Sequence, residues 1–334
     1  MRSGQVCIHG DPNQVDSFVA CLVAVVNAWK HAVSYDWVAG LAGIAFSPVQ
    51  DPGEDCTAWW MEAGSDSRTD LLGSALGFTV TRVTRDATWD DEARGSYAET
   101  GMLPAPHDDH FARIRAAFDR GDAIVMRTWP AWSLLVGWSQ DLDDLPFATV
   151  PGFQGSVAGI WGPAKAQLAY LLNPIPPELT VEETVGEALS YGARVAGGVG
   201  QESSLGYGAS LYLSAAQHMQ DEYFCPSCRE HSDSCAHRTL MRMLGTQRSA
   251  VGFLRDARVL VDVDLPWEPA IDRFVGMAEV TSVYCGWADF QASWPNEIYR
   301  RNLRRDLRTL AALQTEAAHT LGELSSAFER QVAG

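Results

Sequence analysis

Lysine and long apolar segments are both scarce in this sequence. Lys30 and Lys165 are its only lysines, and 25 basic residues stand against 42 acidic ones, which gives a formal net charge of −17. Proteins that bind nucleic acid need clustered Lys and Arg to contact phosphates, so this balance argues against nucleic acid as a partner. No apolar run approaches the ~20 residues that cross a bilayer, so we expect no membrane partner.

The first residues also lack the apolar segment of a secretory signal. The opening letters, MRSGQVCIHGDPNQ, are mostly polar or small. The seven cysteines are odd in number, and three of them fall within eleven residues, which does not suit a disulfide framework. We therefore expect a cytoplasmic protein.

The chain does have enough apolar residues for a large core. Hydrophobic residues make up 46% of the chain and charged residues 20%, and a length of 334 residues predicts two compact units. The Pro-rich PIPPEL segment marks a rigid joint between them. We expect an α+β domain over residues 1–177 and an all-helical domain over residues 178–334.

The first domain is expected to combine helices with short strands. The spacing of apolar residues predicts helices over 16–30 and 34–46, one from Asp66 or Ser67 to Gly77, and one from Asp109 to Gly121. The first of these is apolar nearly all round, which predicts a buried helix, and Asp16 or Ser17 can cap it. The segments FTVTRVT, AIVMRTW, WSLLVGW and GSVAGIWG are short and β-prone, and they favour a small antiparallel sheet.

The second domain carries only helical patterns, over residues 179–196, 207–222, 237–258, 267–291 and 296–330. In the last segment, apolar residues recur at alternating spacings of three and four, with Gln314 interrupting: Leu303, Leu307, Leu310, Ala317, Leu321, Leu324 and Phe328. This pattern predicts the core seam of an antiparallel bundle, and a coiled-coil homodimer is the alternative.

The segment FCPSCREHSDSCAH contains a compact set of metal-binding residue types. Cys225 and Cys228 are separated by two residues, and Cys235 and His237 follow closely, with His231 as an alternate ligand. Thiolate and imidazole are the preferred ligands of tetrahedral zinc, and four such ligands favour a structural ion without an open position. A disulfide or redox pair, or plain reduced cysteines, are the alternatives.

Candidate nucleophiles cluster at the start of the first helix. Ser17 lies where the helix dipole favours an anion, but a serine hydroxyl needs an adjacent base, for which His9 is the candidate. Its alternative role is helix capping. Cys21 lies one turn further along and is expected to be a small core residue.

Four segments together resemble a known family. They are the buried helix DSFVACLVAVVNAW, the GLAGIAFS segment, the helix and strand FARIRAAFDRGDAIVMR, and the strand PAWSLLVGW. Their order and pattern are similar to the family built on the N-terminal domain of butirosin biosynthesis protein H, a papain-like fold that also resembles bacteriocin-processing cysteine peptidases. The resemblance covers most of the chain, because the helical half is similar to the helical extension of these proteins.

The resemblance implies acyltransferase or cysteine-peptidase ancestry, but the catalytic positions depart from the pattern. Active members use a Cys at the start of the first helix and a His on the later strand. These positions fall at Ser17 and Ala131 here, and alanine cannot accept a proton. Trp129 and Trp132 flank Ala131, so we expect the strand to line a cleft shaped for packing or binding.

Three functions follow from these patterns. The first is a non-catalytic papain-like protein, a pseudoenzyme that binds a small molecule, a peptide or a carrier protein, in keeping with secondary metabolism. The second is an acyltransferase or amidohydrolase of the butirosin H type with a non-standard nucleophile such as Ser17. The third is a helical interaction protein stapled by zinc. We favour the first of these.

Overall fold

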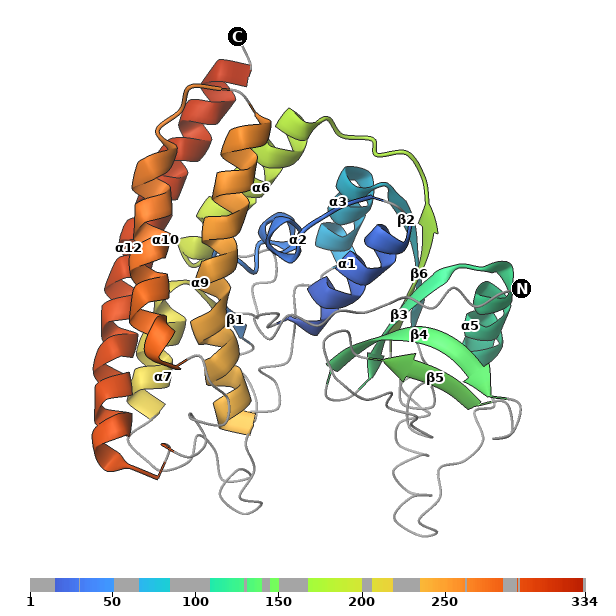
Figure 1. The fold of residues 1–334 in the computed structure, drawn as a ribbon, viewed down its shortest axis with the longest axis horizontal. Helices are drawn as coiled ribbons and strands as arrows, with labels where there is room; N and C mark the ends of the chain where they lie inside the picture. Colours follow the sequence, from blue (N-terminus) through green and yellow to red (C-terminus); the bar gives the residue numbers. More distant parts are fainter. Residues whose placement is uncertain are drawn as a thin grey trace. The chain divides into compact units, whose positions relative to one another are not determined.

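The computed structural model describes parts of both halves of the chain. The described residues are 16–29, 31–50, 66–84, 109–128, 131–139, 145–149, 168–199, 206–218, 235–261, 263–284, 293 and 295–332. Their contacts divide the chain into two compact units. Unit 1 consists of Met1–Val33 and Leu76–Glu178, and unit 2 consists of Ser34–Ala75 and Leu179–Gly334. The predicted mixture of an α+β part with a small antiparallel sheet and a helix-rich C-terminal part is confirmed (Figure 1).

The division differs from the predicted one in the segment 34–75, which the contacts assign to unit 2. The reason is that helix α2 (Tyr35–Ala42) packs against α9 (Cys235–Leu260) and α6 (Val181–Ala196). A Cβ at Gly40 would overlap the Phe253 ring, so glycine permits the close approach of α2 and α9.

The sheet of unit 1 has five antiparallel strands in the order β2-β6-β3-β4-β5. These strands are β2 (Phe78–Thr84), β3 (Ala123–Thr128), β4 (Ala131–Ser139), β5 (Leu145–Thr149) and β6 (Leu168–Pro174). The predicted strands FTVTRVT, AIVMRTW and WSLLVGW correspond to β2, β3 and β4. The segment GSVAGIWG lies outside the described residues.

Two helices cover opposite faces of this sheet. Helix α5 (Asp109–Arg120) packs on β2, β3 and β6, and its core side chains meet Ile124, Met126, Ala169 and Leu171. Helix α1 (Ser17–Ala28) packs on β3 and β4, and its contact residues on the sheet include Tyr170. Because neighbouring residues of a strand point to opposite faces, Tyr170 lies on the face opposite Ala169 and Leu171.

Strands β5 and β6 of unit 1 were not predicted from the sequence patterns, and β6 is the more central of the two. It lies between β2 and β3, and Leu168–Leu172 are all buried. A strand covered on both faces is apolar without alternation, so β6 lacks the period-two signal that FTVTRVT carries in β2.

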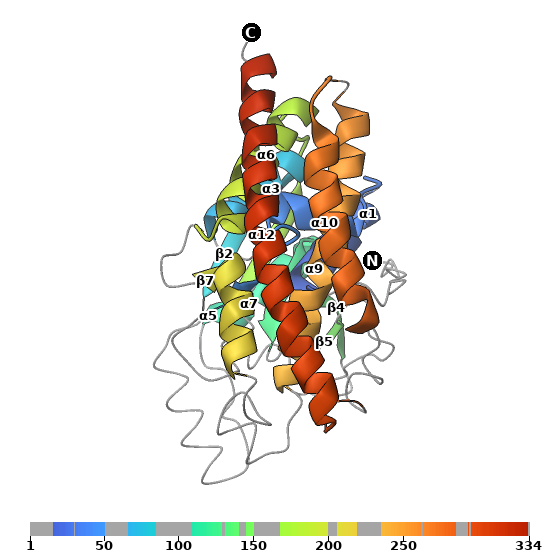
Figure 2. The ribbon, with the colours of Figure 1, turned by 90° about the vertical axis from the view of Figure 1, so that its left-hand side faces the viewer.

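Unit 2 is built around α12 (Glu297–Val332), which contacts α6, α7 (Ala209–His218) and α10 (Trp267–Thr281). Helices α9, α10 and α12 run side by side in both views (Figure 1 and Figure 2). A 3-10 turn, η3 (Ser282–Tyr284), follows α10, and a two-stranded sheet pairs β1 (Val49–Gln50) with β7 (Gly206–Tyr207). Helix α3 (Asp66–Leu76) ends at Gly77, which has a φ of 80°.

The predicted seam of the last helix is confirmed. Its seven apolar members are all buried on α12, whose bounds lie within two residues of the expected 296–330. The predicted segment 267–291 is helical only as far as Thr281, and residues 285–291 lie outside the described residues. Among the helices in the described parts of the chain, none combines the length and apolar character needed to cross a bilayer.

Candidate functional site

The start of α1 is set by Asp16. Its Oδ1 accepts a hydrogen bond from Val19 N at 3.0 Å, so Asp16 rather than Ser17 is the cap. Ser17 is the first helical residue and is 8% exposed. The helix cap therefore leaves the Ser17 hydroxyl to make contacts beyond its own helix.

The Ser17 hydroxyl meets the start of β4. The backbone N–H of Trp132 donates a hydrogen bond to Ser17 Oγ at 3.0 Å, between residues 115 positions apart in the chain. Trp132 directly follows Ala131, which opens β4 and pairs with Thr128 of β3. The structure thus brings together the two segments in which the resemblance places a thiol and an imidazole.

Aromatic rings fill the space around this junction. The Trp132 ring stacks on Tyr170 with centroids 5.3 Å apart and planes inclined by 11°, and Phe18 lies 4.8 Å from the same indole. Trp132 is 4% exposed, so its indole packs inside unit 1. Its expected role in lining a cleft stays a prediction.

The chemistry at this junction follows from the bond at Ser17 Oγ. An N–H donor stabilises charge on an oxygen but cannot remove the hydroxyl proton, and a serine becomes a nucleophile only beside a base. Alanine at position 131 offers no basic group. The bond from Trp132 N therefore links the start of α1 to the start of β4 without removing the Ser17 proton.

The other predicted residues of unit 1 are only partly described. Cys21 is fully buried in α1, in agreement with its expected role as a small core residue. His9 and Trp129 lie outside the described residues.

Only some of the predicted zinc ligands belong to the described part of the chain. Cys225, Cys228 and His231 lie outside the described residues, whereas Cys235 and His237 belong to the first turn of α9. The zinc site therefore stays a prediction from the spacing of its ligands.

Arg68 of α3, in unit 2, carries no motif that marks it as a site residue in the sequence. Its side chain is 2% exposed, and its guanidinium carbon lies 4.1 Å from the centroid of the Tyr191 ring on α6. Burial lowers the pKa of Arg68 to about 10, against opposing effects of Tyr191 and Glu187, and Arg194 lowers it as well. The group thus remains charged at neutral pH.

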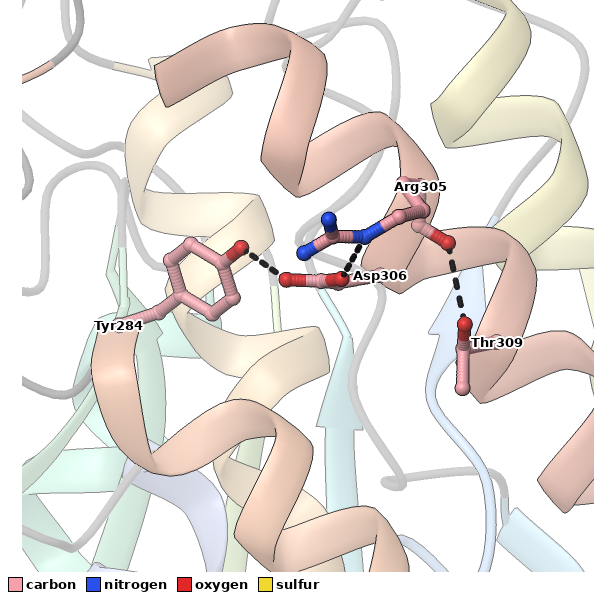
Figure 3. A network of polar contacts seen from close by, with 4 residues as sticks. All are labelled: Tyr284, Arg305, Asp306 and Thr309. Carbon is pink, nitrogen blue, oxygen red and sulfur yellow. Dashed lines mark hydrogen bonds and ion pairs between the residues drawn. The ribbon is translucent and has the colours of Figure 1, made fainter. Parts of the chain in front are cut away.

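Figure 3 shows a polar network in unit 2 that ties η3 to α12. Tyr284 Oη donates to Asp306 Oδ2 at 2.6 Å, and Arg305 Nε donates to Asp306 Oδ1 at 2.9 Å. Thr309 Oγ1 donates to the Arg305 carbonyl at 3.3 Å. Burial and the adjacent Asp306 carboxylate raise the pKa of Tyr284 above its ordinary value, so the phenol stays a hydrogen-bond donor. The bond between Tyr284 and Asp306 joins η3 to α12, whereas the other two bonds lie within α12, so we interpret the network as structural.

Comparisons with known proteins add no family. No protein-family model matches the chain, and no curated protein matches its sequence.

Proposed function

We propose that unit 1 is a papain-like domain of the butirosin H type that binds a small molecule, a peptide or a carrier protein without Cys/His catalysis. The observation that carries the proposal is the 3.0 Å hydrogen bond from Trp132 N to Ser17 Oγ. In the family, the start of the first helix and the later strand must meet, because they supply the two halves of a catalytic dyad. Here the corresponding segments meet through a serine and a backbone amide.

The surrounding framework supports the same proposal. Helix α1 is buried against β3 and β4 of an antiparallel sheet, which is the setting that a papain-like fold gives to its first helix. Ser17 and Ala131 together lack both the thiol and the imidazole. Loss of both groups removes the thiol nucleophile and its imidazole base, which favours binding over Cys/His catalysis.

An acyl-thioester probe tests whether catalysis is absent. We expect the full chain, incubated with a simple acetyl thioester, to form no acyl adduct at Ser17 and to release thiol no faster than the Ser17→Ala variant does. Intact mass and peptide mapping measure the adduct, and a thiol assay measures turnover. An adduct at Ser17, or at one cysteine of the folded protein alone, would favour the acyltransferase instead.

Restoring the dyad tests the papain-like placement. We expect the variant carrying Ser17→Cys and Ala131→His to react with iodoacetamide at pH 6 about tenfold faster at position 17 than Ser17→Cys alone, because a nearby imidazolium lowers a thiol pKa. Peptide mapping separates this position from the native cysteines. Equal rates in the two variants would contradict the proposed placement of residues 17 and 131.

For unit 2 we propose a structural zinc ion held by Cys225, Cys228, Cys235 and His237, with His231 as the alternate ligand. The spacing of these thiols and imidazoles supports it. Metal analysis of the purified protein should find about one equivalent of zinc, and the Cys228→Ser variant should lose it. Less than roughly half an equivalent in the unsubstituted protein would count against the site.

A further inference from the structure

Arg68 presents a pair of buried donors that the described residues do not satisfy. Its Nε and Nη2 are buried and have no hydrogen-bond partner in the described part of the chain. These two nitrogens form one edge of the planar guanidinium, and their N–H bonds point the same way. That edge is the one that binds two oxygens of a carboxylate or a phosphate in a bidentate pair.

A second cation lies close to the same place. The guanidinium carbon of Arg194 lies 5.4 Å from the centroid of the Tyr191 ring, the ring that also holds Arg68. Arg194 is exposed, and two positive groups beside one ring repel each other. The surroundings of the Tyr191 ring thus concentrate positive charge in a chain whose net charge is −17.

The nearby negative charge does not satisfy these donors. Glu187, one turn before Tyr191 on α6, attracts Arg68 electrostatically, but it is exposed and makes no hydrogen bond to Nε or Nη2. Proteins rarely bury a charged group without an opposite charge and hydrogen bonds, because the loss of water is then uncompensated. The Arg68 edge therefore has the character of half of an ion pair.

We propose that unit 2 binds the oxyanion of a small molecule, a carboxylate or phosphate group, through the Nε–Nη2 edge of Arg68, with Arg194 as the second cation. Tyr191 positions both guanidinium groups, and Arg194 provides the first point of encounter because it is exposed. The proposal does not depend on the function proposed for unit 1.

The experiment measures anion binding by the full chain. Thermal unfolding and titration calorimetry are carried out with inorganic phosphate and with acetate, each against chloride at the same ionic strength. We expect the preferred anion to raise the melting temperature by about 2–4 °C. A larger effect of phosphate indicates a phosphorylated ligand, and a larger effect of acetate indicates a carboxylate ligand.

Variants identify the binding groups. Arg68→Met should abolish the anion effect, and Arg68→Lys should weaken binding about tenfold because it loses the bidentate edge. Arg194→Gln should also weaken binding, because it removes the second cation. Arg255→Met, at an exposed position of α9, is the matched control and should bind as the unsubstituted protein does.

The decisive comparison is made without the anion. In chloride, Arg68→Met should melt at or above the temperature of the unsubstituted protein, since it removes a buried charge that lacks a partner. Failure of Arg68→Met to fold, or a much lower melting temperature, would show that the protein itself pairs Arg68 and would overturn the proposal. An equal rise in phosphate with and without Arg68 would reduce the effect to general salt stabilisation and would also overturn it, as would no rise with either anion.

Discussion

Unit 2 buries two polar side chains in different ways, Gln314 in the middle of α12 and Arg68 beside Tyr191. The buried donor of Gln314 has hydrogen-bond acceptors, whereas Nε and Nη2 of Arg68 have none in the described residues. Gln314 is 1% exposed, and its Nε2 donates to the carbonyls of Phe46 at 2.8 Å and Ala196 at 3.3 Å. Ala196 ends α6, so Gln314 binds a carbonyl that lacks a partner within its own helix. Arg68 has no comparable backbone acceptor for Nε and Nη2 in the described residues.

The difference separates two kinds of buried polarity. A polar side chain that binds the backbone of neighbouring elements fixes how those elements pack, and its presence is explained by the fold. Packing does not explain a buried cation without such partners. Its opposite charge is then expected to come from a group other than the described residues.

The largest loss of stability is expected from the apolar side chains of the α12 seam. Leu310→Ala removes a fully buried side chain and should lower the free energy of unfolding by about 2–5 kcal/mol, because it leaves a cavity among α12 and its neighbours. Urea unfolding followed by helical circular dichroism measures the loss. Leu213→Ala, at a position 51% exposed on α7, is the control and should change the free energy by less than about 0.5 kcal/mol. Similar losses in the two variants would contradict the seam as the core of unit 2.

Replacing Gln314, the polar residue of the seam, should lower the free energy of unfolding less than Leu310→Ala does, but clearly more than Arg68→Met does. Gln314→Leu keeps the volume but leaves the Phe46 and Ala196 carbonyls without this donor, so the free energy of unfolding should fall by about 1–3 kcal/mol. Gln331→Leu, at an exposed position of the same helix, is the matched control. Two results would contradict a stabilising role for the Gln314 hydrogen bonds of the expected size. One is a Gln314→Leu variant as stable as the unsubstituted chain, and the other is a variant that loses more free energy of unfolding than Leu310→Ala.

The sequence predicted elements whose signals are local. The seam of α12 follows from its spacing of three and four, and the end of α5 follows from Gly121, which has a φ of 93°. The sequence predicted Asp16 or Ser17 as the N-cap of α1, and in the structure the cap is Asp16. Each of these features depends on residues within about one or two helical turns of one another.

Features that depend on distant residues were not predicted. Nothing local in β6 distinguishes a strand buried on both faces from a buried helix segment. The assignment of α2 to unit 2 depends on Phe253, more than two hundred residues away. Arg68 did leave a signal, since it shares one helical stripe with Leu72 and Leu76, but its lack of a partner could be recognised only in the fold.

The Ser17 junction extends the contrast to unit 1, where the buried polar group is satisfied as Gln314 is. Ser17→Ala leaves the buried Trp132 N–H without its acceptor and should lower the free energy of unfolding by about 1–2 kcal/mol. Denaturant unfolding followed by tryptophan fluorescence reports the change, with Ser282→Ala at an exposed serine as the control. No loss in Ser17→Ala would mean that the hydrogen bond does not hold α1 against β4.

The smallest effect at neutral pH is expected at the network of Figure 3, where alkaline pH makes it visible. Tyr284→Phe should lower the free energy of unfolding by about 0.5–1.5 kcal/mol, since Asp306 keeps its bond to Arg305. Because burial raises the pKa of Tyr284 in the folded state, the unfolded phenol loses its proton first as the pH rises above about 10. The stabilisation is therefore present below about pH 10 and is lost above it, a loss that Tyr284→Phe should lack.

Urea unfolding between pH 8 and 11 measures this difference, and the comparison with Tyr284→Phe removes the contribution of the other tyrosines. Asp306→Asn keeps an acceptor but removes the carboxylate, so it should reduce the alkaline loss without abolishing it, because burial is the larger cause of the raised pKa. If the unsubstituted chain and Tyr284→Phe lost stability in parallel, Tyr284 would not be held protonated by its surroundings. Tyr284 would then not count among the buried polar groups that find their partners within the fold. Only Gln314 and Ser17 would remain as the counterparts of Arg68.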